Sequence, residues 1–252
     1  MSLGPGITLT HGDMFTELLK IAPASIDAVI TDVPYGETSL KWDRWPTGWL
    51  AAVAPLLKRS GSLWCFGSMR MFLEHAEEFR EHFRFVQDIV WEKQNGSGFH
   101  ADRFKRVHEA AVHWAPKGVK WSETFNLPVT TNDATARTVR RKKRPAHWGE
   151  VGESTFTSQD GGPRLMRSVI TVKNCHGRAL HPTQKPEDIV EPLLRSSVPP
   201  GGLVLDPFAG SGTTLAVARS LGMRCIGIEA NATYFEAATD RLRGTFQFGG
   251  TA

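Results

Sequence analysis

Apolar runs of strand length alternate with helical stretches at both ends of this 252-residue chain, and this alternation constrains its fold most strongly. Such a pattern is typical of a parallel sheet with helices on both faces. The periodicity fades between residues 94 and 180, where one further strand is expected at 110–115. We therefore predict an α/β fold: a doubly wound, mostly parallel, Rossmann-like sheet built from residues 1–93 and 181–252, with 94–180 as an inserted region. The expected strands are 7–10, 26–31, 62–66, 85–91, 203–206 and 224–229, and the expected helices are 14–20, 47–57, 69–82, 186–196, 213–221 and 232–243.

Hydropathy and cysteine usage narrow the class of protein. No apolar run approaches the ~20 residues that a membrane span requires, and the N-terminus lacks the basic-then-apolar pattern of a signal peptide. A cytoplasmic protein without a membrane partner is therefore expected. Cys65, Cys175 and Cys225 are widely spaced and lack C-x-x-C spacing. We expect reduced core thiols, with neither a disulfide framework nor a metal site.

Positive charge is concentrated in the middle of the chain. Residues 94–185 contain 16 Lys and Arg against 7 Asp and Glu, a net charge of +9, while the whole chain carries +4 and the remainder therefore −5. A local positive field of this kind suits a polyanionic partner. Within it lies a basic run without acidic residues, which is expected to bind nucleic-acid phosphates, although a solvated loop explains the run equally well. The basic run consists of Arg137, Arg140, Arg141, Lys142, Lys143 and Arg144.

A βαβ unit near the C-terminal end carries a candidate cofactor loop. Its first strand ends at Asp206, and Gly210 and Gly212 allow a tight turn before the next helix. The following strand ends in Glu229, whose carboxylate can accept hydrogen bonds from two ribose hydroxyls. Leu215 occupies the position of the third glycine of a dinucleotide fingerprint. The unit therefore predicts a nucleoside-bearing cofactor and disfavours NAD or FAD.

A second acidic turn follows the expected strand 26–31. Asp32 ends that strand, Pro34 holds the turn, and Tyr35 projects from it. Such a turn can bind the exocyclic amine of a base, a weak nucleophile because its lone pair is delocalised into the ring. A carboxylate and the backbone carbonyl of Val33 or Pro34 would each accept one amino hydrogen, while an aromatic ring stacks on the base. Taken alone, an Asp in a proline turn is more often structural.

Together these segments resemble the S-adenosylmethionine-dependent DNA amino-methyltransferases, in the permuted class whose catalytic motif precedes the cofactor motif. Residues 32–35 (Asp-Val-Pro-Tyr) are similar to the family pattern Asp/Asn/Ser-Pro-Pro-Tyr/Phe, with valine in place of the first proline. Residues 206–212 are similar to the cofactor loop, and 181–186 (His-Pro-Thr-Gln-Lys-Pro) to a segment that meets the methionine end of the cofactor. Gly12-Asp13 resembles a segment associated with the cofactor adenine. The resemblance implies that S-adenosylmethionine is bound by Asp13, Thr183, Lys185, Asp206, Phe208, Gly210, Gly212 and Glu229.

The resemblance further implies methyl transfer to N6 of a flipped adenine in DNA. Asp32 and the backbone at Val33 would hold the amine, Pro34 would shape the turn, and Tyr35 would stack on the base. An aspartate in the first position favours adenine N6 over cytosine N4, for which serine is more frequent. Residues 94–180 correspond by position to the target-recognition region, and Asp43 is a candidate for the wall of the base pocket.

Several alternatives stay open from the sequence. One is an amino-methyltransferase acting on cytosine N4, on RNA or on a protein glutamine; another is a catalytically impaired DNA-binding homologue, because valine at position 33 is less rigid than proline. A nicotinamide oxidoreductase is the least favoured. A homodimer and a restriction endonuclease partner are both compatible with the sequence. His108, Glu109 and His113 are not expected to bind zinc, because the histidines are five residues apart rather than four.

Overall fold

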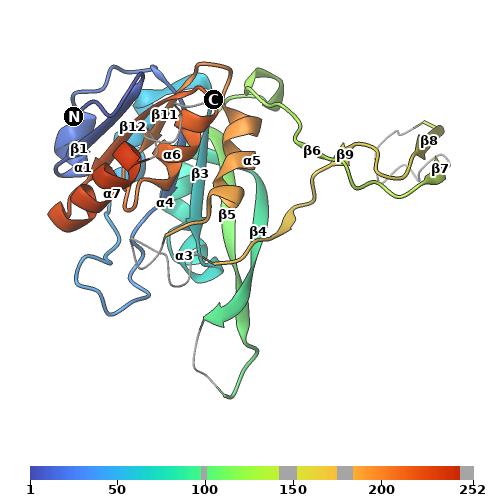
Figure 1. Ribbon diagram of the computed structural model, residues 1–252, viewed down its shortest axis with the longest axis horizontal. Coiled ribbons are helices and arrows are strands. Elements are labelled where there is room, and N and C mark those ends of the chain that lie inside the picture. The colour runs from blue at the N-terminus through green and yellow to red at the C-terminus, as the bar shows by residue number, and fades with distance from the viewer. Residues whose placement is uncertain (98–100, 142–151, 175–183, 245–252) are drawn as a thin grey trace. The chain divides into compact units, whose positions relative to one another are not determined.

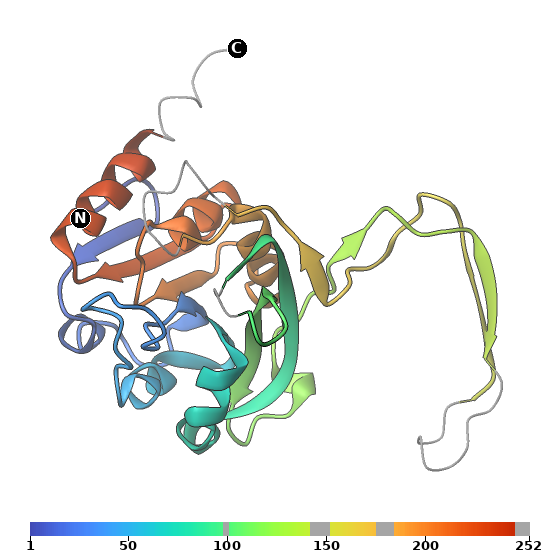
Figure 2. The same cartoon turned by 90° about the horizontal axis from the view of Figure 1, so that it is seen from below.

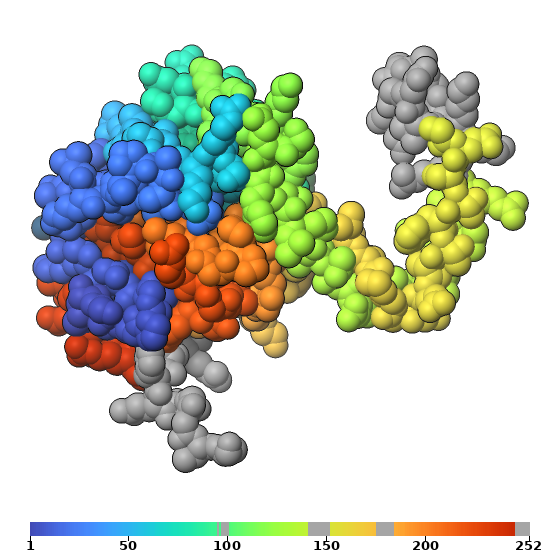
Figure 3. Space-filling view, turned by 90° about the horizontal axis from the view of Figure 1, so that it is seen from above, coloured from blue at the N-terminus to red at the C-terminus, as the bar shows by residue number. Residues whose placement is uncertain are grey.

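The computed structural model describes residues 1–97, 101–141, 152–174 and 184–244, and two compact units contain them. Unit 1 comprises Met1–Leu127 and Ser168–Ala252, and unit 2 comprises Pro128–Arg167. Both ends of the chain therefore contribute to unit 1. Figure 3 shows the blue N-terminal segments beside the orange and red C-terminal segments on one face of this unit. No helix of the described residues is long and apolar enough to cross a membrane.

One sheet forms the centre of unit 1 (Figure 1). Its strands lie in the order β1 (Ile7–His11), β12 (Arg224–Glu229), β11 (Leu203–Asp206), β2 (Ile26–Asp32), β3 (Leu57–Gly67), β5 (Arg106–Pro116), β4 (Phe83–Ser97) and β10 (Val169–Thr171). These strands pair in parallel, apart from β5, which is antiparallel to both β3 and β4. The N-terminal β1 pairs with β12, and β2 pairs with β11, so the two ends of the chain interleave as predicted.

Helices cover both faces of this sheet, with blue and cyan helices on one side and orange and red helices on the other (Figure 2). Alternation along β2 separates the two layers: Ala28 and Ile30 face one hydrophobic cluster, and Val29 between them faces the other. The predicted doubly wound, mostly parallel fold is confirmed. The first cluster includes residues of α5 (Glu187–Ser197), α6 (Thr213–Ser220) and α7 (Ala232–Gly244), and the second includes residues of α1 (Met14–Leu18), α2 (Trp49–Val53), α3 (Met69–Glu74) and α4 (Ala76–His82).

Two predicted helices are shorter in the structure. The helix expected at 47–57 consists of α2 followed by the 3-10 turn Ala54–Leu56, because β3 already begins at Leu57. The helix expected at 69–82 is interrupted at His75, where the backbone leaves the helical region and the imidazole stacks on Trp45 with ring centroids 3.7 Å apart. A tertiary contact therefore divides a segment whose local pattern is continuous.

Unit 2 contains two short antiparallel strand pairs. The strand β6 (Thr130–Thr131) pairs with β9 (Arg164–Leu165), and β7 (Arg137–Arg141) pairs with β8 (Ser154–Ser158). We call the β7–β8 pair the basic ribbon. Its described side chains are mostly exposed, including Phe156 at 59%. With both faces open to solvent, these strands lack the apolar alternation that identifies a strand in a sequence.

The inserted region predicted at 94–180 is too wide. The strand β4 continues to Ser97, and β5 and β10 both belong to the sheet of unit 1. Only Pro128–Arg167 forms a separate unit. The expected strand 110–115 corresponds to β5, whose residues Ala111 and Trp114 are buried in opposite layers of the core. The nearly continuous apolar run of β5 is buried on both faces, which is typical of an interior strand of a sheet covered on both sides.

Candidate active site

Three carboxylates lie at the carboxyl ends of neighbouring parallel strands. Asp32 ends β2, Asp206 ends β11, and Glu229 ends β12. Since β11 pairs with both other strands, the three acids meet at one edge of the sheet. They line a cavity of about 210 Å³. The structure thus brings together the two acidic turns that are more than 170 residues apart in the sequence, at the edge where ligands bind in open α/β sheets.

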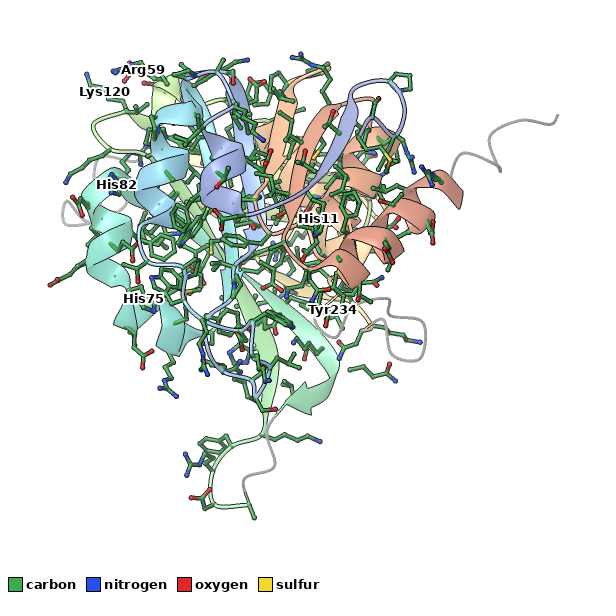
Figure 4. The ribbon with its side chains drawn as sticks, turned by 90° about the vertical axis from the view of Figure 1, so that its left-hand side faces the viewer. His11, Arg59, His75, His82, Lys120 and Tyr234 are labelled. Atoms are coloured by element: carbon green, nitrogen blue, oxygen red, sulfur yellow. The ribbon has the colours of Figure 1, made fainter. Side chains whose placement is uncertain are left out.

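Most of the residues predicted for the site line this cavity. They are Asp13, Asp32, Pro34, Lys185, Asp206, Phe208, Gly210 and Glu229. Val33, Tyr35 and Gly212 are not among its lining residues, and Thr183 lies outside the described residues. Phe66, Trp42 and Tyr234 also line the cavity, although no motif identified them. Figure 4 labels Tyr234 near the start of α7, on the same side of the molecule as His11 at the end of β1.

The side chains of Val33 and Tyr35 hold the turn after β2 against the core. Val33 is only 1% exposed, because its side chain packs in the hydrophobic layer beneath the sheet edge. Its side chain therefore faces the core. Tyr35 packs against the same layer, and burial together with the charge of Asp32 raises the pKa of its phenol above the usual value. Both side chains anchor the turn.

Asp43 fixes the shape of this turn. Its carboxylate accepts hydrogen bonds of 2.8 Å each from the backbone N–H groups of Tyr35, Gly36 and Thr38. Burial opposes its charge, but the hydrogen bonds from Thr38, Gly36 and Tyr35 outweigh burial and lower the pKa of Asp43. Asp43 is not among the lining residues of the cavity, and its expected place in the wall of a base pocket stays a prediction. It supports the turn from outside the cavity.

The segment after Asp43 is fastened to α4. Glu78 accepts hydrogen bonds from the indole N–H of Trp45, at 2.8 Å, and from the backbone N–H of Gly48, at 2.9 Å. His75, labelled in Figure 4, stacks on the same indole. The turn is consequently fixed at Asp43 and again a few residues later, so little conformational freedom remains to be lost when a ligand binds.

The loop after β11 is built around Asp206 and Glu229. Asp206 Oδ1 accepts hydrogen bonds from Thr31 Oγ1 at 2.9 Å and from Phe208 N at 3.2 Å. Burial raises the pKa of Asp206 to about 6, although these hydrogen bonds favour the charged form. The Glu229 carboxylate accepts from Gly210 N and Asn231 N, both at 2.8 Å. The two acids thus shape the loop as well as line the cavity.

Glycines in this βαβ unit serve two purposes. Gly210 and Gly212 have φ values of +50° and +72°, which favour glycine and permit the tight turn before α6. In a dinucleotide fingerprint the third glycine, on the helix, allows close contact between helix and strand. Here the glycine lies on the strand instead: a Cβ on Gly227 of β12 would lie 2.7 Å from Leu215 Cδ1. Leu215 on α6 therefore packs onto the strand because the strand carries the glycine.

A buried cluster of four charges lies beside Asp32, two of whose members, Asp32 and Lys185, line the cavity. Lys185 Nζ is 2.5 Å from Asp32 Oδ2 and 3.5 Å from Glu109 Oε2. Lys93 Nζ is 2.5 Å from Glu109 Oε1. The four side chains are between 7% and 19% exposed, and their formal charges cancel. We call Asp32, Lys185, Glu109 and Lys93 the charge cluster.

Burial and pairing act in opposite directions within the charge cluster. Burial raises the pKa of Asp32, against the lowering effect of the Lys185 ammonium. Burial also opposes the charge on Lys185, but Asp32 and Glu109 outweigh it and raise the pKa of that ammonium. Burial opposes ionisation of Glu109 as well, but Lys185 and Lys93 outweigh it and lower the pKa of Glu109. The pairing therefore keeps Lys185 and Glu109 charged.

Sequence reasoning missed Lys93 and Glu109, and considered Glu109 only beside the two histidines. The signal lies in the topology. Because β5 runs antiparallel to its neighbours, residue 109, near the start of that strand, reaches the edge where β2 ends. Lys93 lies towards the end of β4, which runs in the direction of β2. No local pattern in the sequence indicates that β5 runs antiparallel to its neighbours.

The basic run belongs to unit 2 and is only partly described. Arg137 and Arg140 are exposed on β7. Arg141 ends β7, and its side chain lies outside the described residues, as do Lys142, Lys143 and Arg144 entirely. The structure therefore assigns the first members of the run to an exposed strand.

Comparisons with known proteins agree with this geometry. The family model of the N6/N4 methyltransferases, described as DNA methylase, matches residues 26–240. The type II methyltransferase M.HinfI of Haemophilus influenzae is 30% identical over 263 residues, which cover 94% of this chain and 68% of that protein. The type II methyltransferase M2.DpnII of Streptococcus pneumoniae is 28% identical over 262 residues, covering 93% and 88%.

Solved structures show the same similarity. The complex of M1.HpyAVI with SAM superimposes with a TM-score of 0.63 at 26% identity and covers 93% of this chain and 99% of that one. The PvuII DNA methyltransferase, described as cytosine-N4-specific, has a TM-score of 0.62 at 16% identity, covers 96% and 94%, and supports the fold alone. The sheet edge, its two acidic turns and these matches lead to one conclusion: the chain belongs to the N6/N4 family of DNA methylases, the S-adenosylmethionine-dependent amino-methyltransferases that its motifs resemble.

Proposed function

We propose that this DNA methyltransferase transfers the methyl group of S-adenosylmethionine to N6 of adenine. The proposal rests on one buried carboxylate oxygen that has no hydrogen-bond partner among the described residues. This oxygen is Asp32 Oδ1, in the wall of the cavity that joins the two acidic turns. A buried acceptor without a donor is costly. An amino hydrogen of a flipped base would satisfy it.

The cofactor end of the cavity has donors and acceptors that fit S-adenosylmethionine. Glu229 uses one lone pair on each oxygen for Gly210 N and Asn231 N and retains further acceptor capacity for ribose hydroxyls. When bound, the cofactor supplies an electrophilic methyl group. We propose that it is held by Asp13, Asp206, Phe208, Gly210, Gly212 and Glu229, with Thr183 and Lys185 at its methionine end.

The catalytic turn would act on the target amine. Asp32 Oδ1 accepts one amino hydrogen, and the backbone carbonyl at Val33, supported by Pro34, accepts the other. These contacts draw the nitrogen out of conjugation with the ring and favour its attack on the methyl carbon. Because Asp43 holds the turn before any ligand arrives, the acceptors need little reorganisation. Stacking of the base on Tyr35 stays a prediction.

Target recognition is proposed for the basic ribbon. Exposed arginines on a two-stranded ribbon can neutralise DNA phosphates, and the major groove admits a two-stranded ribbon. We propose that Arg137, Arg140 and Arg141, followed by Lys142, Lys143 and Arg144, bind DNA. The relatives are named type II methyltransferases, which supports a place in restriction–modification. A restriction endonuclease partner, a homodimer and a cytoplasmic location stay predictions.

The choice of adenine N6 rests on the aspartate that opens the catalytic turn. Cytosine N4 is the second candidate target, and Val33 in place of proline makes an impaired enzyme the third. The test uses mixed genomic DNA and methyl-labelled S-adenosylmethionine, followed by digestion to nucleosides and mass spectrometry. Label in N6-methyladenine is expected. Label in N4-methylcytosine would contradict the base assignment, and cofactor binding without label would identify an inactive homologue.

A matched pair of variants tests the role of Asp32. Asp32→Asn should lose methyl transfer and retain cofactor binding. Asp27→Asn is the control, because Asp27 lies at the opposite end of the same strand and is also buried, paired with Lys58 at 2.8 Å. Equal loss in both variants would show a structural effect rather than a catalytic one.

A further inference from the structure

Two buried carboxylate oxygens of the charge cluster lack a hydrogen-bond donor within the described part of the chain. They are Asp32 Oδ1 and Glu109 Oε2. Lys185 Nζ lies between the two carboxylates, in hydrogen-bond contact with Asp32 Oδ2 and 3.5 Å from Glu109 Oε2. That second distance is too long for a strong charge-assisted hydrogen bond, which is about 2.7–2.9 Å. Lys185 is therefore one short movement away from a second carboxylate.

The position of Lys185 is unfavourable for the proposed reaction. The Lys185 ammonium beside Asp32 neutralises the carboxylate that must accept the amino hydrogen. It also places positive charge near a nitrogen that becomes positive as it attacks the methyl carbon. Catalysis requires stabilisation of the charge that develops in the transition state. The ammonium should therefore leave Asp32 when the target amine arrives.

Glu109 lies in a position to bind the Lys185 ammonium when it leaves Asp32. Lys93 holds the other oxygen of Glu109 at 2.5 Å and so fixes the carboxylate and keeps it charged. Glu109 and Lys93 come from the antiparallel pair β5 and β4, in which Glu109 is paired in register with Trp91. The backbone of Lys185 is anchored too, since its carbonyl accepts a hydrogen bond of 3.1 Å from Thr213 Oγ1. Only the lysine side chain needs to move.

Resting on the proposed function, we infer that Glu109 is a positioning residue for methyl transfer: when the target amine binds Asp32, the Lys185 ammonium shifts from Asp32 to Glu109. Asp32 then acts as a fully charged acceptor, and the ammonium remains paired. Lys93 maintains Glu109 as the receiving group. The total charge of the cluster does not change during this exchange.

A double-mutant cycle tests the inference under single-turnover conditions. Glu109→Gln should slow methyl transfer by at least about tenfold, with cofactor affinity within about twofold of wild type. In a Lys185→Met background, measured at saturating cofactor because Lys185 is also proposed to hold its methionine end, the same substitution should change the rate by less than about twofold, since no ammonium remains to be withdrawn. Lys185→Gln replaces Lys185→Met if the latter does not fold. Asp27→Asn, the buried acid at the other end of β2, should leave the rate unchanged.

A pH profile supplies a readout that simple loss of packing would not move. The negative charge of Glu109 raises the pKa of Asp32, so Glu109→Gln should shift the acidic limb of the rate profile to lower pH. The other groups facing Asp32 are the ammonium groups of Lys185 and Lys93 and the titratable side chains of Tyr35, Cys65 and Asp206.

The outcomes separate the inference from the proposed function. Equal slowing by Glu109→Gln in both backgrounds, or a wild-type rate in the single variant, would overturn the exchange while the methyltransferase assignment stands. If wild-type protein methylates no amine in DNA, the proposed function falls and the exchange falls with it. The tenfold effect confined to the background that contains Lys185 is the expected result.

Discussion

The sheet edge of unit 1 and the basic ribbon of unit 2 are built on opposite principles. At the sheet edge, charged side chains are buried and most of their charged groups have hydrogen-bond partners. Asp206, for example, accepts hydrogen bonds from Thr31 and Phe208. On the basic ribbon, Arg137 and Arg140 are exposed, and the strands are held by their own backbone ladder. A group that performs chemistry on a base benefits from exclusion of water, whereas a group that binds a phosphate works from solvent.

A substitution of a charged residue should have a larger effect at the sheet edge than on the basic ribbon. Burial multiplies the energetic effect of each charge at the sheet edge, because the effective dielectric constant there is low. Exposure reduces the effect of each charge on the ribbon, so that binding there depends on the sum of several charges. Identical substitutions in the two regions should therefore have unequal consequences.

Asp32→Asn should reduce the rate of methyl transfer by about 10²–10³-fold, because an amide replaces the only charged acceptor proposed for the target amine. Cofactor affinity should stay within about twofold. Quench-flow measurement with labelled cofactor gives the rate, and titration calorimetry gives the affinity. A variant that keeps more than a tenth of the wild-type rate would contradict the role of Asp32.

Asp206 should make stability dependent on pH. Its folded-state pKa of about 6 lies above the ordinary value of 3.8, so the native state binds the proton more tightly than the unfolded state. Stability should therefore fall as pH rises through this window. Relative to Asp206→Asn, wild type should lose about 2–3 kcal/mol between pH 3.5 and pH 7. Urea unfolding at several pH values measures this, and a constant difference between the two proteins would contradict it.

Asp43→Asn should loosen the catalytic turn. One carboxylate oxygen becomes an NH₂ group that cannot accept from a backbone N–H, which costs about 1–3 kcal/mol and should also slow methyl transfer. The matched substitution in unit 2 is Asp133→Asn, which removes an exposed pairing with Arg164. Chemical denaturation should show a clearly smaller change for Asp133→Asn. Equal changes would mean that burial does not distinguish the two regions.

Replacement of Arg137 and Arg140 by Gln should have the smallest effect on the reaction itself. Each lost phosphate contact should reduce the slope of log affinity against log salt by about 0.9, with stability and cofactor binding unchanged. Arg195→Gln on α5 is the control, because this exposed arginine pairs with Glu191 in unit 1. Fluorescence anisotropy at several salt concentrations measures the slope. A slope equal to that of wild type would make the basic run an ordinary solvated loop.

Much of the fold could be predicted because its signals are local. The strands that end at Asp32, Asp206 and Glu229 carry apolar runs followed by acidic turns, and the structure brings all three acids to one cavity. The bounds of the inserted region could not be predicted, since β10 has only three residues and returns to the sheet after a long excursion. The strands of unit 2 were missed because exposed strands have no apolar period.

The class of fold, the order of the two motifs and the family can be read from the amino-acid sequence, because each depends on short runs of residues with characteristic spacing. The support of the turn by Asp43, and the completion of the charge cluster by Glu109 and Lys93, are visible only in the folded protein. Those contacts depend on a reversed strand and on burial. Pairing direction is set by the packing of the whole sheet, and the strength of a charge is set by the atoms that surround it.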